Sequence, residues 1–541
     1  MGFFTLVLLG VGALVARYFV LLFANSKPRR DAHSGLLLPP ALPDIVPYLG
    51  PLAGVGYLID PLSFAKINHA RLGNIFSCTV LGKTLTFVQG PELISAYSSA
   101  SESDFSLLEA YKIMLGKLVG HDVFQPIGKE VYSALSAARV ERVLPIISRQ
   151  GVDCIDKAFQ QGAEIDIIPL INETVVKIAT TVLCDAATSD AFGVQLAKDL
   201  HVLQNDHSPL AGFAPWATAV TARRAEAKTR ILQTFRDVAQ SHLDAMTKSG
   251  GEGVDGFITY LVHHRFGAEK LTGKLDSSAV LPRFVPRKMS PAEHAAQMDG
   301  LVLLLYGMVF GAHSNTVMAT VSLLFDLLER PQTLRKILAE AAAHPGVGEP
   351  GFDLRNHVEL NRAGSESWRI RSSGGLWRQV REDGFALGEY ALPKGSLVTI
   401  NQGVVNRDEA LYAGTPVSVA AASATATAAA TSATVAPAAE AFDSERYEKF
   451  TLDGDTQSPS ASAKCAQAAT FGLGRHLCPG RLLAYRIVGC LVLTMLRYDL
   501  KVGKQPKMWM RLPIAGIDRA VGEARVQVGN KRSGQMVHPG K

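Results

Sequence analysis

Residues 471–480 read FGLGRHLCPG, and an apolar helical run, RLLAYRIVGCLVLTML, follows directly from Arg481. Cys478 therefore lies in a glycine-rich loop immediately before a helix. Backbone amides at a helix N-terminus stabilise negative charge and lower the pKa of a thiol, which favours the thiolate. The sequence predicts that Cys478 is held as a thiolate that acts either as a nucleophile or as a metal ligand.

Three roles are open for this thiolate, besides the packing role that most free cysteines have. A nucleophilic cysteine needs a histidine base, and His476 is two residues away, but catalytic partners are brought together by the fold rather than by local spacing. Zinc needs more ligands than one cysteine and one histidine at this spacing. A single cysteine thiolate can, however, serve as the axial ligand of haem.

The ten residues closely resemble the haem-binding signature of the cytochrome P450 superfamily, F-G-x-G-R-H-x-C-x-G, with Phe471, Gly474, Cys478 and Gly480 on its fixed positions. The resemblance implies a haem cofactor whose iron is bound by Cys478. It also implies that Phe471 packs beside the sulfur and that His476 donates to a haem propionate. The implied fold is mainly α with minor β.

An E-x-x-R pair, Glu366 and Arg369, precedes the cysteine loop. This spacing alone is a common helical salt-bridge spacing. The family, however, places such a pair on a helix and locks it onto an arginine of a later segment, and FDSERY at 442–447 offers Arg446 in the required order. The residues before the pair, NRAGS at 361–365, are poor helix formers where the family has an apolar helical run.

The stretch from Gly375 to Asp383 resembles the strand from which an arginine of this family reaches the second haem propionate. A guanidinium suits this role because it binds a carboxylate through two parallel hydrogen bonds. Arg378 is the expected residue, and Arg381 is the alternative. The sequence NRDEALY at 406–412 resembles the family segment that follows.

A long helix is predicted to begin at Ser290, which combines an N-cap serine with Pro291 at the first helical position and Glu293 three residues later. Nothing interrupts the pattern before Arg330, so the helix has about 40 residues. Its apolar character nearly all round is typical of a helix threaded through the middle of a protein. A second membrane span at 301–312 is the alternative, but that uninterrupted stretch is too short.

In the family, this central helix crosses the distal face of the haem with the pattern A/G-G-x-D/E-T-T/S. Here Gly311 fits the pattern, His313 replaces the acid and Ser314 replaces the usual threonine. The expected catalytic group consists of Ser314, His313, Asn315 and Thr316. The hydroxyls of Ser314 and Thr316, and a histidine that titrates near neutral pH, can deliver protons. The alternative is that His313 only fills a polar gap in a packed helix.

The Asn315-Thr316 pair and the segment from Glu366 to Asp383 resemble the branch that contains sterol 7-hydroxylases and prostacyclin synthase. That branch includes both hydroxylases and redox-neutral isomerases. The resemblance therefore leaves the reaction type open while it implies the same cofactor.

An amino-terminal membrane anchor is predicted over residues 1–24, because Gly2 to Phe23 form an apolar span of about 20 residues with Arg17 as its only charge. The cationic residues that follow at 27–30 place the remainder of the chain in the cytosol. A cleaved signal peptide is the alternative, although the span is longer than usual for one. Residues 25–50 form a proline-rich hinge, and the expected location is the endoplasmic reticulum membrane, with a single pass.

One haem-thiolate catalytic domain is expected over 51–529, with a β-hairpin at 75–88, a low-complexity insertion at 415–441 and a flexible tail at 530–541. The chain is 47% hydrophobic and 19% charged, which excludes a disordered protein. Its six cysteines contain no C-x-x-C pair, as is typical of a reduced, cytosol-facing protein. The net charge of +6 is spread along the chain in both signs, so nucleic acid is not an expected partner.

The expected function is a membrane-anchored monooxygenase that hydroxylates or epoxidises a lipophilic small molecule, such as a terpenoid, steroid or polyketide, in a fungal biosynthetic pathway. The chain has no flavin or dinucleotide fingerprint, so electrons are expected from a separate NADPH-cytochrome reductase. By resemblance, the substrate pocket lies between the central helix and residues 107–124 and 203–247. The alternatives are a redox-neutral isomerase or dehydratase and a non-catalytic haem- or lipid-binding protein.

Overall fold

The computed structural model describes residues 29–32, 34–42, 56–57, 59–80, 83–119, 129–160, 164–205, 218–251, 256–268, 281–408, 442–447, 470–511 and 516–532. The predicted anchor at 1–24 and the predicted insertion at 415–441 lie outside these ranges. So does half of the predicted proline-rich hinge, including residues 43–50.

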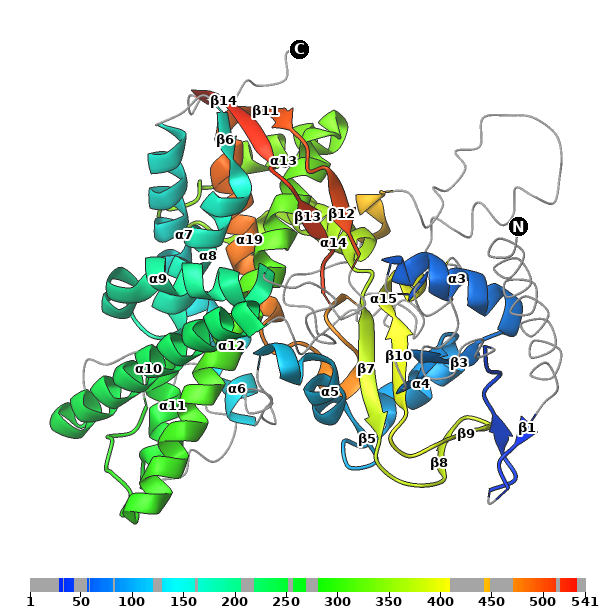
Figure 1. Cartoon of the computed structure of the whole chain (residues 1–541). Coiled ribbons are helices and arrows are strands. Elements are labelled where there is room, and N and C mark those ends of the chain that lie inside the picture. Colours follow the sequence, from blue (N-terminus) through cyan, green and yellow to red (C-terminus); the bar gives the residue numbers. More distant parts are fainter. Residues whose placement is uncertain are drawn as a thin grey trace, which may run out of the picture.

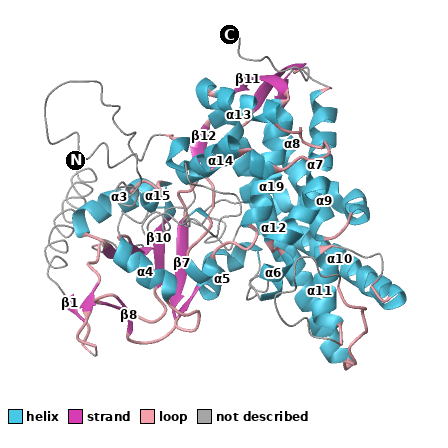
Figure 2. Ribbon diagram, turned by 180° about the vertical axis from the view of Figure 1, so that it is seen from behind, coloured by secondary structure: helices cyan, strands magenta, loops and turns pink. Residues whose placement is uncertain are grey.

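The described chain consists of a large helical region and a smaller region built around a sheet, which lie side by side (Figures 1 and 2). The fold is mainly α with minor β, as the sequence predicts. The longer helices outside the centre are α3 (Pro61–Leu72), α4 (Pro91–Ser99), α5 (Leu107–Val119), α7 (Ala137–Phe159), α8 (Ile167–Leu183), α9 (Ala186–Asn205), α10 (Thr218–Ser249), α11 (Phe257–Phe266), α13 (Pro331–Ala343), α14 (Val358–Arg371) and α19 (Arg481–Leu496). Shorter helical pieces are α6 (Lys129–Ala134), η2 (Leu354–Asn356), α15 (Gln402–Val405), η3 (Ser444–Tyr447) and η4 (Gly474–His476).

The central helix, α12 (Pro291–Leu328), has 38 residues. Ser290 and Glu293 form the reciprocal capping box that the sequence predicts, with Pro291 in the first turn. Among the described helices, α12 alone has the length and composition to cross a membrane. The helices α8, α10, α14 and α19 pack against it, which explains why it is apolar on nearly every side.

A five-stranded sheet with the order β3-β4-β10-β7-β5 forms the centre of the smaller region. The predicted hairpin is confirmed, since β3 and β4 pair antiparallel from Ile75 opposite Val88 to Val80 opposite Lys83. Strand β10 pairs parallel with β4 and antiparallel with β7. The strands are β3 (Ile75–Val80), β4 (Lys83–Val88), β10 (Leu397–Asn401), β7 (Gly375–Val380) and β5 (Phe105–Ser106).

Three smaller sheets complete the described fold, with the orders β1-β2-β9-β8, β11-β14-β6 and β12-β13. The pairing of β14 with β11 reaches Lys531, which lies opposite Tyr498. The first two residues of the predicted tail, Asn530 and Lys531, therefore belong to strand β14, because its pairing continues to Lys531. The strands are β1 (Arg29–Arg30), β2 (Leu37–Leu38), β6 (Glu164–Asp166), β8 (Phe385–Leu387), β9 (Tyr390–Leu392), β11 (Tyr498–Lys504), β12 (Met508–Met510), β13 (Arg519–Val521) and β14 (Arg525–Lys531).

The poor helix formers at 361–365 are part of α14 despite their low propensity. Asn361 donates from its side-chain amide to the carbonyl of Leu354 at 2.9 Å. The Ser365 hydroxyl donates to the Asn361 carbonyl and shares a 2.9 Å hydrogen bond with the hydroxyl of Tyr485. Tertiary hydrogen bonding and burial thus override local propensity in this segment.

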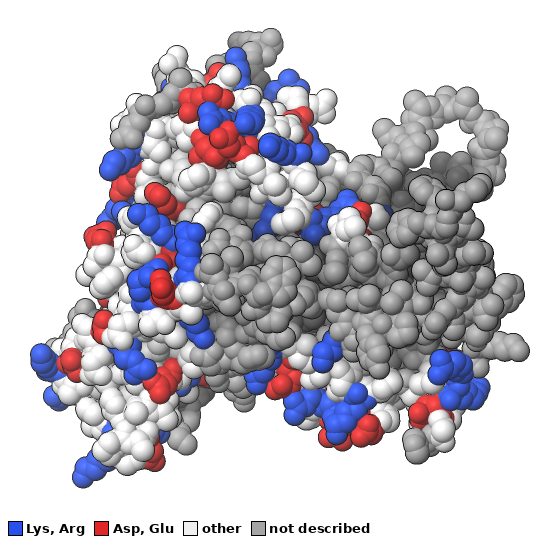
Figure 3. All heavy atoms as spheres, in the orientation of Figure 1, with Lys and Arg blue, Asp and Glu red and all other residues white. Residues whose placement is uncertain are grey.

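Charged side chains of both signs are interspersed over the described part of the surface in Figure 3. This mixture agrees with the sequence-based view that the small positive net charge is not gathered into a basic stripe.

Replacing the helix N-cap should destabilise the protein measurably. Ser290→Ala removes the acceptor for the Glu293 amide and should lower the free energy of unfolding by about 0.5–2 kcal/mol. Ser290→Asp keeps an acceptor and should remain close to the original stability. Urea unfolding of the cofactor-loaded protein, followed by circular dichroism, gives the comparison. Equal midpoints for the two variants would contradict the capping role.

Candidate haem site

The loop that carries Cys478 is held by backbone contacts that require glycine. The Cys478 amide donates to the carbonyl of Phe471 at 2.7 Å and closes the loop. Gly472 and Gly474 have φ angles of 95° and 59°, in the left-handed region that favours glycine. A Cβ added at Gly474 would lie only 2.3 Å from the carbonyl oxygen of Ser98, so no other residue fits there.

The sulfur of Cys478 lies at the N-terminus of α19. Burial raises the pKa of the Cys478 thiol, while hydrogen bonds from the amides of Gly480 and Arg481 and the Arg481 guanidinium act in the opposite direction. The net direction is opposite to the sequence-based prediction of a lowered pKa, because desolvation outweighs the helix N-terminus. A thiol of this kind is not an activated nucleophile by itself. The amides aimed at its sulfur suit a thiolate whose charge is also balanced by a bound metal.

The ring of Phe471 connects the loop to two helices. It lies 5.9 Å from the ring of Trp368 on α14, in an edge-to-face arrangement, and 5.5 Å from the ring of Tyr485 on α19. Aromatic pairs at such separations contribute stability beyond the area that they bury. The cluster therefore holds the start of the cysteine loop against both helices, while its expected contact with the sulfur stays a prediction.

Arg378 lies on β7 with its side chain almost fully buried. Its Nη1 donates to the carbonyl of Tyr97 at 2.7 Å, and its guanidinium lies 4.6 Å from the centre of the Tyr97 ring. Its Nε is buried and has no hydrogen-bond partner among the described residues. Burial lowers the pKa of Arg378, and the nearby charge of Arg475 contributes to this shift. A buried cation with an unused donor, beside a second cation, fits an anionic group such as a haem propionate.

The alternative residue, Arg381, is placed differently. Its Nη1 lies 3.5 Å from Oε1 of Glu109, and its side chain is 47% exposed. This surface ion pair leaves Arg378 as the better candidate for an internal anion.

The side chain of His476 contacts an acidic side chain rather than open space. Its Nε2 lies 3.1 Å from Oε2 of Glu102. Burial would raise the pKa of Glu102, but contacts with His476, Ser106 and the amides at the start of α5 lower that pKa to about 2. A propionate would have to share His476 with this carboxylate, which the sequence did not predict.

Gly311 marks an open face of α12. A Cβ added there would meet no described atom within 4 Å, and Gly311 is exposed, whereas Val309 and His313 on either side of it are buried. Asn315, four residues later and so on the same face, is also exposed. The space beside Gly311 fits the position that the sequence resemblance gives to the haem.

His313 points away from that face. It is 2% exposed, and its Nε2 hydrogen-bonds the side-chain oxygen of Asn172 on α8. Burial lowers the pKa of His313 to about 3, and the charges of Arg519 and His201 add to the shift. The expectation that His313 titrates near neutral pH is therefore wrong. The alternative, in which His313 fills a polar gap in a packed helix, describes its surroundings better.

Ser314 keeps a hydroxyl close to the open face. Its Oγ accepts a 2.8 Å hydrogen bond from Nη2 of Arg519 on β13. Asn315 accepts from the amide of Ile517 at 3.4 Å, whereas Thr316 is buried in the helix packing. Sequence reasoning missed Arg519, since nothing in its local sequence connects it with a helix two hundred residues earlier.

The E-x-x-R pair forms a fully buried unit. Arg369 donates to both carboxylate oxygens of Glu366, at 2.6 and 2.7 Å, and donates from Nη1 to the carbonyl of Asn406 at 2.6 Å. The amide of Asp443 donates to Glu366 at 2.7 Å, so the segment at 442–447 does lie against α14. The side chain of Arg446 lies outside the described residues, and its expected contact with the pair stays a prediction.

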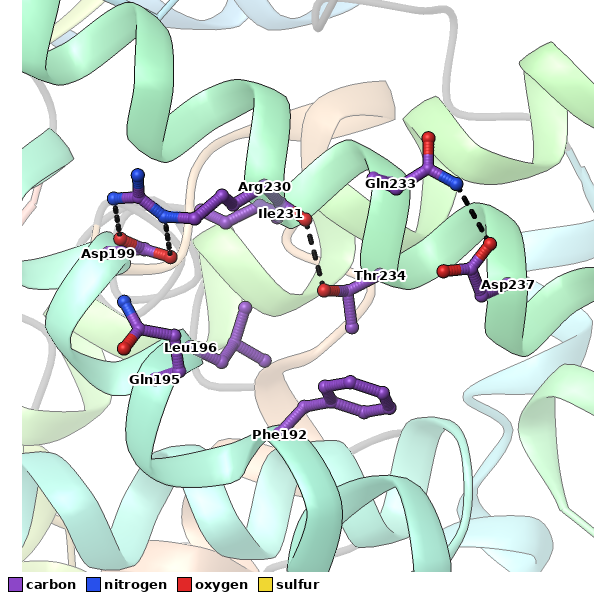
Figure 4. A pocket seen from close by; sticks show the side chains of 9 residues that line it. All are labelled: Phe192, Gln195, Leu196, Asp199, Arg230, Ile231, Gln233, Thr234 and Asp237. Atoms are coloured by element: carbon purple, nitrogen blue, oxygen red, sulfur yellow. Dashed lines mark hydrogen bonds and ion pairs between the residues drawn. The ribbon is translucent and has the colours of Figure 1, made fainter.

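A separate groove lies on the surface between α9 and α10 (Figure 4). It has a volume of about 230 Å³ and is lined by Phe192, the Asp199–Arg230 ion pair and neighbouring side chains. No residue of the cysteine loop or of the Gly311 face lines it. The groove is therefore not part of the candidate haem site.

Bare metal ions are not favoured by the described residues. They contain no group of three or more His, Cys, Asp or Glu side chains that could hold a metal ion. A cysteine at a helix N-terminus, a buried arginine with an unused donor and an open helix face supply what a haem-thiolate site needs: a thiolate ligand, a cation for a propionate and room beside a helix.

Comparison with known proteins agrees with this class. The family model described as Cytochrome P450 matches residues 268–417. The solved structure of retinoic acid-bound cyanobacterial CYP120A1 superposes with a TM-score of 0.64 at 17% identity, covering 91% of this chain and 99% of that one. The sterol 14-demethylase of Arabidopsis thaliana is 20% identical over 501 residues, which is 90% of this chain and 89% of that protein. The cytochrome P450 monooxygenase pyvB of Aspergillus violaceofuscus is 24% identical over 508 residues, or 92% and 88%.

The chain belongs to the cytochrome P450 superfamily. It is an enzyme of the cytochrome P450 monooxygenase class, whose cofactor is haem bound through a cysteine thiolate, and membership implies a redox partner and a lipophilic substrate in general terms. The branch of sterol 7-hydroxylases and prostacyclin synthase, and the fungal origin, stay predictions.

Removing Arg378 should weaken haem binding. Arg378→Ala deletes a buried cation, and losing a charge-assisted hydrogen bond costs about 1.5–3 kcal/mol, or more than about tenfold in haem affinity. Arg381→Ala removes an exposed arginine directly after the end of β7 and should leave the affinity unchanged. The transfer of haem to an excess of apomyoglobin measures the difference.

Because Arg378 is buried, replacing it also affects packing, so the folding of each variant is measured separately. Arg378→Lys keeps a cation, and circular dichroism monitors the helix content of each variant. If a folded Arg378→Ala variant retains haem as well as Arg381→Ala does, Arg378 does not bind the cofactor.

Proposed function

We propose that Cys478 is the axial ligand of the haem iron and that the chain is a membrane-anchored monooxygenase of a lipophilic small molecule. The observation that carries the proposal is the partly buried Cys478 thiol at the start of α19, where the amides of Gly480 and Arg481 and the Arg481 guanidinium act to lower its pKa against the effect of burial. These donors hold a thiolate charge in a site that burial otherwise makes unfavourable for it.

When bound, haem with a thiolate ligand supplies the splitting of dioxygen and the transfer of one oxygen atom to a C–H or C=C bond, the other being reduced to water. The protein's own groups provide the setting for this chemistry. Arg378, with the neighbouring charge of Arg475, would hold a propionate. Gly311 leaves room beside α12 because it has no side chain. Ser314 holds a hydroxyl proton at this face, in a hydrogen bond from Arg519.

His313 has no part in proton delivery in this proposal. Its contact with Asn172 and a pKa of about 3 keep it neutral and turned toward α8. Ser314 is therefore the residue of the expected group that we propose as catalytic. Asn315 and Thr316 shape the helix around it.

The lipophilic substrate class rests on the relatives and on the sequence. Several relatives are named as sterol or lanosterol 14-demethylases, and one is named as a cytochrome P450 monooxygenase of Aspergillus violaceofuscus. We propose a terpenoid, steroid or polyketide as substrate. The apolar span from Gly2 to Phe23 supports an anchor in the endoplasmic reticulum membrane, with electrons from NADPH-cytochrome reductase on the cytosolic side.

A redox-neutral isomerase or dehydratase is a second candidate. The specific observation in its favour is that neither an acid nor a titrating histidine accompanies Ser314 on the open face of α12 among the described residues. Such an enzyme would keep the haem and Cys478 but would need no reductase.

Cys478→Ala should abolish the red-shifted Soret band of the ferrous–CO complex, because that band depends on thiolate ligation. Cys490→Ala is the matched control, since Cys490 is a buried cysteine of α19 whose sulfur lies 3.6 Å from the Ser148 hydroxyl, and it is expected to serve packing. The absorption spectrum of the reduced, CO-treated protein measures the band. A Cys478→Ala protein that keeps the band would refute the assignment.

The two proposed reaction types can be distinguished by whether the enzyme needs electrons from NADPH. A monooxygenase should consume NADPH in a substrate-dependent way when reductase is present, and an isomerase should form product without it. Absence of product under both conditions would leave a haem- or lipid-binding protein without turnover.

A further inference from the structure

The carboxylate of Glu102 closes the N-terminus of α5. Its Oε2 accepts a hydrogen bond from the Leu107 amide at 3.0 Å, and its Oε1 accepts one from the Leu108 amide at 3.1 Å. Its Oε1 also accepts from the hydroxyl of Ser106 at 2.6 Å, and Ser106 Oγ accepts from the Glu109 amide at 3.0 Å. The first three amides of the helix, which have no partner inside it, are therefore bonded to these two side chains.

The same carboxylate contacts the cysteine loop. Glu102 Oε2 lies 3.1 Å from Nε2 of His476, which ends η4 two residues before Cys478. With a pKa of about 2, Glu102 is ionised at neutral pH. One charged side chain thus joins the first turn of α5 to the loop that carries the proposed iron ligand.

The charge of Glu102 also acts on the other residue proposed to bind a haem propionate. Burial lowers the pKa of Arg378, and the negative charge of Glu102 acts in the opposite direction. Backbone pairing brings the two segments together, because Phe105 on β5 lies opposite Val380 on β7, two residues after Arg378. Glu102 is therefore coupled to both expected propionate partners, His476 by contact and Arg378 by charge.

The described side chains of α5 contribute little to the core. Among residues 107–113, Ala110 alone is fully buried, and the others are half-buried. Elements with few buried contacts are the ones that open most easily, so the capping by Glu102 matters more here than in a well-packed helix. Residues 107–124 are also an expected wall of the substrate pocket, and a movement of α5 would change that pocket.

We propose that Glu102 is a positioning residue that transmits the state of the haem-binding loop to α5 and so to the substrate pocket. The contacts run from His476 to the carboxylate of Glu102 and from there to the amides of Leu107 and Leu108. A change at His476 alters a partner of the carboxylate that also closes the helix, so the first turn of α5 responds. This inference rests on the proposed monooxygenase site and links its cofactor side to its substrate side.

Hydrogen exchange of the full-length, haem-loaded protein, followed by mass spectrometry, tests this link. His476→Gln leaves α5 itself unaltered, yet it should speed exchange of the Leu107 and Leu108 amides by about threefold or more, because their acceptor loses its cationic partner. Variants are compared at equal haem content. Exchange in α8 is the internal reference, since a general loosening of the protein would appear there as well.

Further variants assign the effect to the Glu102–His476 contact. Glu102→Gln should speed exchange at the start of α5 by itself, and adding His476→Gln should then have no further effect, as expected for two residues that act through one contact. His476→Arg keeps a cation and should stay close to the original rate. Glu92→Gln is the control, because Glu92 is an exposed acid in the first turn of α4, and it should leave α5 unchanged.

Two ligands of different size connect α5 to the pocket. Imidazole and the bulky apolar imidazole clotrimazole can each bind haem iron through a ring nitrogen, and the shift of the Soret band reports their affinities without any turnover. Glu102→Gln should weaken binding of clotrimazole by about threefold or more and leave that of imidazole unchanged, because only the large molecule reaches α5.

Three results would overturn the inference. One is that His476→Gln leaves exchange of the Leu107 and Leu108 amides unchanged relative to α8, as expected if Glu102 is only a local cap. Another is that His476→Gln acts equally with and without Glu102. The third is that Glu102→Gln does not separate the two imidazoles, which includes failure of clotrimazole to bind. Failure of the underlying function looks different, because the ferrous–CO band of thiolate ligation would then be absent from the unaltered protein.

Discussion

The position of the cysteine loop depends on a buried ion pair on another helix. Glu366 and Arg369 have no exposed side-chain surface, and hydrogen bonds join them to Asn406 and Asp443, on segments that follow α14 in the chain. Removing one partner of such a pair costs about 3–5 kcal/mol, because a charge is then left alone in the interior. The same helix presents Trp368 to Phe471, so fixing α14 also fixes the start of the loop that ends at Cys478.

Features that depend on local chemistry were predictable from the sequence. Three such features could be predicted from neighbouring residues alone, and the structure contains all three. They are the capping box of Ser290 and Glu293, the hairpin at 75–88 and the change from loop to helix after Cys478. The direction of the Cys478 pKa was not predictable in this way. The helix N-terminus can be read from the sequence, whereas the degree of burial is a property of the whole fold.

Features that depend on contacts between distant segments could not be predicted from the sequence. The orientation of His313 is set by Asn172 on α8, and the helical state of residues 361–365 depends on contacts with η2 and α19. Glu102 and Arg519 approach the site from segments far from the cysteine loop in the chain. A motif can name the residue types that a site needs, but partners brought in by tertiary packing decide which of them are free to act.

The parallel pairing of β4 with β10 sets the order in which the molecule can assemble. Leu85 lies opposite Leu397, so the early hairpin obtains its neighbour only after nearly the whole helical region has been synthesised. Until then the hairpin has an uncovered edge, and a contact of such long range is slow to form. The sheet, whose first two strands come early in the sequence, is therefore completed on the ribosome only after β10 has been synthesised.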